Sequence, residues 1–128
     1  MENNIIKRLK VGTLKIVEKH NHYFSRIHVE DIAVALTLSL RKFGTGQVFN
    51  ISDNYPCSNE EIAKYASNLM KMSLPQKIKP EDNKSKMLKS FYKDSKKVCN
   101  KKMKQFFFYE LKYPTFKEGL NMIRNNMI

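Results

Sequence analysis

The sequence predicts a mixed, incomplete α/β fold with few strands and about four to five helices. Two observations predict it. Only two segments carry good strand signals, whereas amphipathic helical patterns occupy much of the remaining chain. In addition, one helix has apolar residues on more than one side, and each such side requires a neighbour. With 128 residues and 41% hydrophobic residues, the chain is expected to form a single domain, residues 1–128, with its own core.

The central stretch, residues 24–42, is expected to be a short extended segment that continues directly into a helix, and Gly44 is expected to end the helix. Ala35 and Leu38 add a second apolar side to this helix. Five apolar residues recur at helical spacing and are expected to form one buried stripe: Val29, Ile32, Ala33, Leu36 and Leu40.

Around this helix, helical spacing predicts a short helix within residues 1–11, and apolar alternation predicts a strand over residues 13–17. Residues 47–53, QVFNISD, are rich in β-forming residues and predict a second strand. Because this strand is apolar and follows a two-sided helix, we interpret it as the edge of a sheet whose other strands the chain does not contain.

Capping boxes predict two further helices. Ser58 with Glu61 begins one that extends to about residue 72, and Thr115 with Glu118 begins another.

Between these two helices, residues 77–95 are expected to form a Lys-rich flexible loop. A short strand over residues 96–99 and a helix capped by Asn100, ending near Phe106, are predicted to follow.

The positive charge is concentrated in one part of the chain. The formal net charge is +12, and residues 77–104 hold eleven Lys against three acidic residues, a local net of +8. This could indicate a nucleic-acid or other polyanion partner. However, the 24 basic residues comprise 20 Lys and only 4 Arg. Arg is the residue that grips phosphate bidentately, and Lys enrichment can also follow from genomic base composition. Both interpretations stay open.

Neither the cysteines nor the histidines predict a metal site. Cys57 and Cys99 form no CxxC motif and are expected to be free, buried thiols. His20 and His22 lack nearby further ligands, so a polar turn around Asn21 is the preferred interpretation.

The sequence has no apolar run of the roughly 20 residues that a membrane helix needs. Its start also lacks a signal-peptide pattern. We therefore expect a cytoplasmic protein without a membrane partner.

Four segments resemble, in order, the C-terminal part of an extended short-chain dehydrogenase/reductase of the NAD-dependent epimerase/dehydratase family. They are IHVEDIA (27–33), GQVFNISD (46–53), DSKKV (94–98) and LKYPTFKEGL (111–120). The resemblance implies a substrate-binding C-terminal lobe without the N-terminal Rossmann half.

In that family the N-terminal half binds NAD or NADP on a glycine-rich turn and supplies a catalytic Tyr-x-x-x-Lys pair. The four glycines of this chain cannot spell GxGxxG. We therefore predict no catalytic and no cofactor-binding residues here, so that NAD or NADP is implied only for the complete fold. Tyr92 and Lys96 do spell YxxxK, but they fall in the segment that resembles a late family element and are interpreted as a chance match.

The resemblance also suggests roles for individual residues. Arg26 and Lys96 adjoin the substrate-side motifs and are predicted to face a substrate. His28 and Asp31 match the HVxD pattern and are predicted to fix the corner between strand and helix. Nucleotide-sugar members usually carry an Arg where this chain has Phe24, which argues against a diphosphate substrate.

A second departure from the family pattern lies in residues 106–108. Three Phe stand there, where the family often has a helix-stopping Gly, so this helix needs either another stop or a frayed end.

The sequence thus predicts a truncated or split remnant of an epimerase/dehydratase-like protein, without activity as an isolated chain. Its expected partner is a separately encoded dinucleotide-binding half, or a second copy through the exposed sheet edge. Two alternatives remain: a basic module that binds nucleic acid or another polyanion, and a non-functional decay product.

Overall fold

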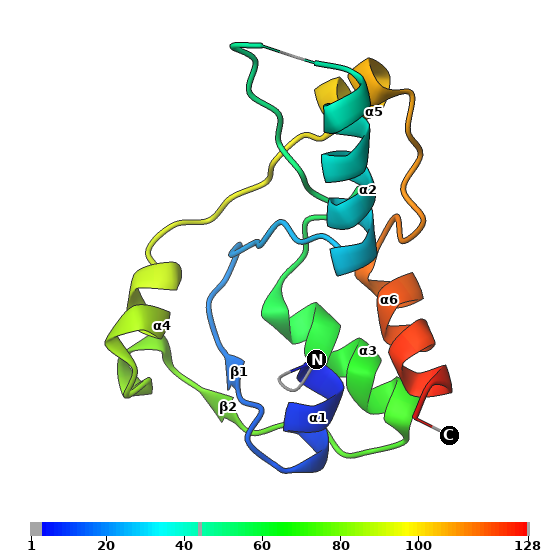
Figure 1. Cartoon of the computed structure of the whole chain (residues 1–128). Helices are drawn as coiled ribbons and strands as arrows, with labels where there is room; N and C mark the ends of the chain where they lie inside the picture. Colours follow the sequence, from blue (N-terminus) through cyan, green and yellow to red (C-terminus); the bar gives the residue numbers. More distant parts are fainter. Residues whose placement is uncertain (1–3, 44, 128) are drawn as a thin grey trace.

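The computed structural model describes residues 4–43 and 45–127 (Figure 1). Within these residues the chain is mostly helical, with six α-helices, one 3-10 helix and a two-stranded parallel sheet. The predicted mixed, incomplete α/β class is confirmed. The elements in order are α1 (Ile5–Lys10), β1 (Ile16–Val17), α2 (Val29–Arg41), α3 (Asn59–Met70), β2 (Lys77–Ile78), η1 (Pro80–Asp82), α4 (Lys86–Phe91), α5 (Lys101–Phe107) and α6 (Phe116–Asn125).

The main core lies around α3, which contacts α1, α6 and β1 (Figure 1). Small residues of α3, such as Ala63 and Ala66, allow the neighbouring elements to approach closely. The buried members of this core are Ile6, Leu9, Leu14, Ile16, Cys57, Ile62, Ala63, Ala66, Phe116 and Leu120.

Both helices predicted from capping boxes are present. At α6 the box is complete, because Glu118 accepts from the backbone N–H of Thr115 at 2.9 Å while the Thr115 side chain caps the helix. At α3 only half of it forms. The Ser58 hydroxyl accepts from the N–H of Glu61 at 3.1 Å, but the Glu61 carboxylate accepts from the Tyr55 hydroxyl instead.

The small sheet pairs β1 with β2 in parallel, with Ile16 opposite Lys77. The strand predicted over residues 13–17 is therefore confirmed at its C-terminal end. Its partner belongs to residues 77–95, the segment predicted as a flexible loop. This segment contains β2, η1 and α4, so it has regular structure, and its flexibility stays a prediction.

Helix α2 is present as predicted, but its buried side differs from the prediction. Ala35 is buried and Leu38 packs against the second core cluster of Met103, Phe107 and Leu111. The predicted stripe is exposed instead, with Leu36 62% and Leu40 75% accessible. The prediction of a buried stripe is wrong because α5 packs on the opposite side of α2, and no described element covers the stripe. The expected helix stop, Gly44, lies outside the described residues.

Two predicted strands are not formed. Residues 47–53 run without strand pairing: Phe49 packs against Phe106 and Phe107, while Val48 is 80% exposed. A strand needs a hydrogen-bonded neighbour, and none of the described elements supplies one there.

Residues 96–99 form no strand either. Side chains hold this segment in place instead, because the Ser25 hydroxyl accepts from the N–H of Val98 at 2.9 Å. The Ser95 hydroxyl likewise accepts from the N–H of Tyr23 at 2.9 Å.

The ends of α5 differ from the expected capping. Asn100 precedes the helix, but its side chain donates to the Ser52 carbonyl and the Asn54 side chain, both at 2.8 Å, rather than capping it. At the other end Phe108 takes the left-handed conformation, with φ 49°, that a glycine would ordinarily adopt. Phe108 is therefore the stop that the missing glycine required.

The polar turn expected around Asn21 is present, and Asn21 itself has φ 51°. His22 is not on its surface, however. Its ring is buried between Phe24 and Tyr92, with centroids 4.6 and 4.9 Å away. Burial accordingly lowers the pKa of His22.

The corner at the start of α2 is built around Asp31, which is completely buried. Its carboxylate accepts hydrogen bonds from the Tyr109 hydroxyl and from the N–H groups of Lys112, at 2.9 Å, and Tyr113, at 3.0 Å. Burial and the hydrogen bond to Asp31 raise the pKa of Tyr109 to about 12.

His28 forms the other part of this corner. Its Nδ1 accepts from the Glu30 N–H at 3.2 Å, and its ring stacks on Tyr113 at 3.7 Å. A Cβ at Gly119 would lie 3.0 Å from the His28 ring, so Gly119 leaves the space that this ring occupies against α6.

We predict that Asp31→Ala destabilises the protein by about 3 kcal/mol, because it leaves three donors without their acceptor in a buried position. Urea unfolding followed by circular dichroism measures this loss. Glu30→Gln is the matched control, since Glu30 pairs with Lys112 at the surface and its removal should change the unfolding midpoint much less. Equal losses for the two variants would contradict the role assigned to Asp31.

Candidate functional site

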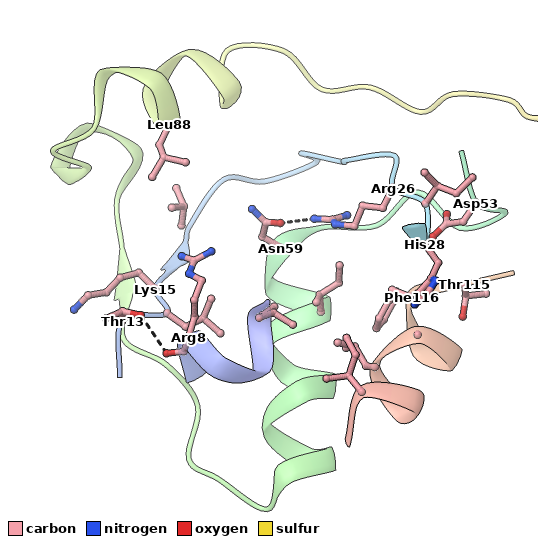
Figure 2. A pocket seen from close by; sticks show the side chains of 18 of the residues that line it. Arg8, Thr13, Lys15, Arg26, His28, Asp53, Asn59, Leu88, Thr115 and Phe116 are labelled. Atoms are coloured by element: carbon pink, nitrogen blue, oxygen red, sulfur yellow. Dashed lines mark hydrogen bonds between the residues drawn. The ribbon is translucent and has the colours of Figure 1, made fainter. Parts of the chain in front are cut away.

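A cavity of about 460 Å³ lies over the main core, where the segment leading into α2 faces α1, α3, α4 and α6 (Figure 2). Most of its wall is apolar, because several side chains that build the main core also line the cavity. The apolar lining residues are Ile5, Leu14, Val17, Ile27, Ile62, Ile78, Leu88, Phe116, Leu120 and Ile123.

Arg26 reaches this cavity because an isolated antiparallel bridge pairs Phe24 with Cys57 just before α3. Its Nη1 donates to the carbonyls of Phe24 and Cys57, both at 3.1 Å, and its Nη2 donates to the side-chain oxygen of Asn59 (Figure 2). Burial lowers the pKa of Arg26, although the guanidinium remains protonated at neutral pH. Among the described residues no carboxylate lies within ion-pair distance of it.

Asn59 connects Arg26 to the far wall of the cavity. Its Nδ2 donates to the Tyr92 hydroxyl at 2.6 Å, and Tyr92 is buried against Phe24. Lys96, in contrast, pairs with Asp94 at the surface and does not line the cavity. Of the two residues predicted to face a substrate, the structure therefore brings only Arg26 to the cavity.

Sequence reasoning missed Asn59, Tyr92 and Asp53 as members of this cavity. In the sequence, Asn59 stands out only by its position inside the capping box of Ser58 and Glu61, which does not indicate a binding role. Tyr92 was noticed only as part of a chance YxxxK match, and Lys96 of that match lies outside the cavity wall.

Asp53 is the one acidic residue among those that line the cavity. It is buried, and its Oδ1 accepts from the Tyr55 N–H at 2.9 Å. Burial raises the pKa of Asp53, and the nearby Arg26 partly opposes this effect.

Two further cations stand at another part of the cavity wall, Arg8 on α1 and Lys15 before β1 (Figure 2). Both are exposed, and the Lys15 ammonium donates to the Gln76 side chain at 2.7 Å. With Arg26, the wall thus carries three formal positive charges against the single carboxylate of Asp53. This balance favours an anionic ligand.

A second, smaller cavity of about 290 Å³ lies between α2 and residues 47–51. Its wall is almost entirely apolar and includes Ile32, Leu36, Phe49 and Ile51. It adjoins the exposed stripe of α2, away from the polar groups of the first cavity.

Some of the lysines of residues 77–104 are engaged within the fold. Lys77 pairs with Glu18 and Glu60, at 3.8 and 3.3 Å. Lys102 donates to the Val48 carbonyl at 2.9 Å. The polyanion partner stays a prediction.

Among solved structures, the chain is similar to a functionally unknown conserved protein from Silicibacter pomeroyi DSS. The two share 32% sequence identity with a TM-score of 0.88, over 94% of this chain and 43% of that one. This chain thus spans less than half the length of the solved protein it matches. No family model matches it, and no curated protein matches it at a significant level.

Within residues 4–43 and 45–127, none of the helices has the length and apolar character needed to cross a membrane. The same residues contain no group of three or more His, Cys, Asp or Glu side chains that could hold a metal ion.

The two cysteines are both free thiols in very different surroundings. Cys57 is buried as expected, whereas Cys99 is exposed, so the prediction of a buried thiol is wrong for Cys99. Cys99 lies in the irregular segment before α5, which leaves its side chain uncovered.

We predict that iodoacetamide at pH 8 modifies Cys99 and leaves Cys57 unmodified in the folded protein. Burial raises the pKa of Cys57 to about 11, so only about one molecule in a thousand carries the reactive thiolate. Peptide mass spectrometry identifies the modified residue. Cys99→Ser should then be inert until urea unfolds it, and rapid alkylation of folded Cys99→Ser would contradict the burial of Cys57.

Proposed function

We propose that this chain is the substrate-binding lobe of an NAD(P)-dependent epimerase/dehydratase-like protein, inactive alone and completed by a dinucleotide-binding half. The observation that carries this proposal is the exposed apolar side of α2. A solvent-exposed helix face with several large apolar side chains marks a surface that another element normally covers.

Helix α2 is apolar on two opposite sides. One side, with Ala35 and Leu38, packs within this lobe. The other carries Val29, Leu36 and Leu40, each at least half exposed. In α/β proteins a helix packed on a sheet buries such a stripe against the strands. The exposed stripe therefore supports the proposal that a sheet from the other half of the protein covers this side of α2.

Residues 47–51 support the same conclusion. They are extended beside α2 (Figure 1). The small apolar cavity lies between them and α2, and they make no backbone–backbone pairing with any described residue. A strand from another part of the protein could pair with this segment. Such pairing would satisfy its backbone groups and cover the exposed Val48 and Ile51.

The similarity to the Silicibacter pomeroyi protein is consistent with this proposal. It leaves about 57% of that protein (100 minus 43) without a counterpart in this chain, which is ample for a further domain. Within this lobe, the cavity around Arg26 is the place for the substrate. Its wall includes Tyr92 but not Lys96, the other member of the YxxxK match, which fits a lobe that depends on the other half for chemistry.

We predict that the isolated chain shows no NAD or NADP binding by calorimetry. A chimera, in which this chain replaces the matched 43% of the Silicibacter pomeroyi protein, should unfold in one cooperative transition and bind NAD or NADP. Micromolar binding by the isolated chain would contradict the proposal, as would absence of binding by the unaltered Silicibacter pomeroyi protein.

The role of the α2 stripe is tested in the same chimera. Leu36→Lys should disrupt docking and split or broaden the unfolding transition, yet leave the isolated chain about as stable as before, because Leu36 is exposed there. Thr37→Lys is the matched control, since Thr37 is exposed on the flank of the stripe. If both variants behaved alike in the chimera, the stripe would not be the docking surface.

A further inference from the structure

We infer that the cavity around Arg26 binds a small amphiphilic monocarboxylate, with its carboxylate on the Arg26 guanidinium and its apolar body along the wall to which α3, α4 and α6 contribute. The site is built from residues of this chain alone. The inference rests on the proposed function only in taking this ligand as the substrate of the complete protein.

Arg26 has hydrogen-bonding capacity that its neighbours do not use. A guanidinium has five N–H groups. Nη1 donates to two carbonyls and Nη2 donates to the Asn59 side chain, which leaves Nε and the second Nη2 hydrogen without an acceptor among the described residues. Nε and Nη2 form the edge of a guanidinium that binds a carboxylate through two parallel hydrogen bonds.

The Arg26 guanidinium is held in place by its neighbours. Arg26 is anchored by the Phe24 and Cys57 carbonyls, which also pair with each other's backbone N–H groups at 3.0 and 3.2 Å. Asn59 is fixed in turn by Tyr92. A cation held in place before binding loses little conformational entropy when the anion arrives, which favours affinity. Its partial burial also weakens screening by salt.

The body of the ligand would lie against an apolar wall. Away from Arg26 the wall consists of side chains such as Ile62, Leu88, Phe116 and Leu120. A volume of about 460 Å³ lies within the range of small-molecule sites, roughly 300–1,000 Å³. An apolar wall of this kind favours binding of an alkyl or aryl group. It would leave the hydroxyl groups of a sugar without hydrogen-bond partners.

The charged groups on the cavity wall favour a ligand with a single negative charge. Asp53 lies close enough to Arg26 to influence it electrostatically and therefore reduces the positive potential at that end. Among the described residues that line the cavity, the other Arg and Lys side chains are Arg8 and Lys15, and both lie on a different part of the wall from Arg26 (Figure 2). A diphosphate would need several such donors. A single negative charge matches a single anchored guanidinium, while Arg8 and Lys15 attract the anion from solution.

The test compares octanoate with 1-octanol as probes for the isolated chain, by calorimetry and by NMR shifts of cavity residues. Octanoate is expected to bind with 1:1 stoichiometry and at least about tenfold more tightly than 1-octanol, since the two differ mainly in the charged group. Arg26→Met should abolish this preference.

Arg26 also holds its own segment in place, so Arg26→Met removes structural contacts as well as the charge. A second pair of variants therefore tests the inference independently. Leu88→Asp puts a negative charge on the cavity wall at a position that is already 39% exposed, and should weaken octanoate binding about tenfold or more. Met87→Asp is the matched control: it adds the same charge to the same helix outside the cavity wall and should change affinity little.

Three results would overturn the inference: no octanoate binding at millimolar concentration, equal affinity for octanoate and 1-octanol, or equal weakening by Leu88→Asp and Met87→Asp. These results are distinct from failure of the proposed function. A chimera that does not bind NAD or NADP leaves octanoate binding by the isolated chain unaffected, and the converse also holds.

Discussion

The buried carboxylate of Asp31 is the interaction on which much of this structure depends. A fully buried charge is tolerated only when its oxygens are hydrogen-bonded, and Asp31 accepts from three donors in residues 109–113. These bonds fix the first turn of α2 against the chain that leads into α6. His28 precedes that turn and stacks on Tyr113, so the segment before α2 is fixed as well. Arg26 lies in this segment, and the corner therefore contributes to the shape of the cavity.

Most of the elements that the sequence predicted correctly are encoded locally, although β1 forms only through its pairing with the distant β2. Ser58 and Thr115 cap α3 and α6 through side-chain bonds to residues two or three positions away, so a short window of sequence contains the signal. Residues 47–53 have an equally clear β composition but no partner strand, and a strand exists only through pairing. The prediction that the α2 stripe is buried was wrong for a related reason. Residue spacing identifies the apolar side of a helix, whereas the burial of that side depends on what packs against it.

The site was less predictable than the fold. Arg26 was expected to face a substrate, and it lines the cavity. Asn59 and Tyr92 were not expected, because they meet Arg26 only through a bridge between residues 24 and 57 and through the path of the chain after β2. No local pattern encodes that convergence. Lys96 points elsewhere, since Ser95 ties this part of the chain to residues 21–23 and leaves the next side chain at the surface.

Helix α2 connects the binding site, which its N-cap His28 lines, to the proposed docking surface on its exposed stripe. His28 caps the helix and lines the cavity, while Leu36 and Leu40 point to the side that a sheet would cover. A helix with a buried, hydrogen-bonded Asp31 cannot rotate about its axis without breaking those bonds. A sheet docked on the stripe would therefore hold α2 in the orientation that the Asp31 corner already selects. If the proposed function holds, the lobe forms its cavity by itself, and a separate dinucleotide-binding half would add chemistry and cover this apolar surface.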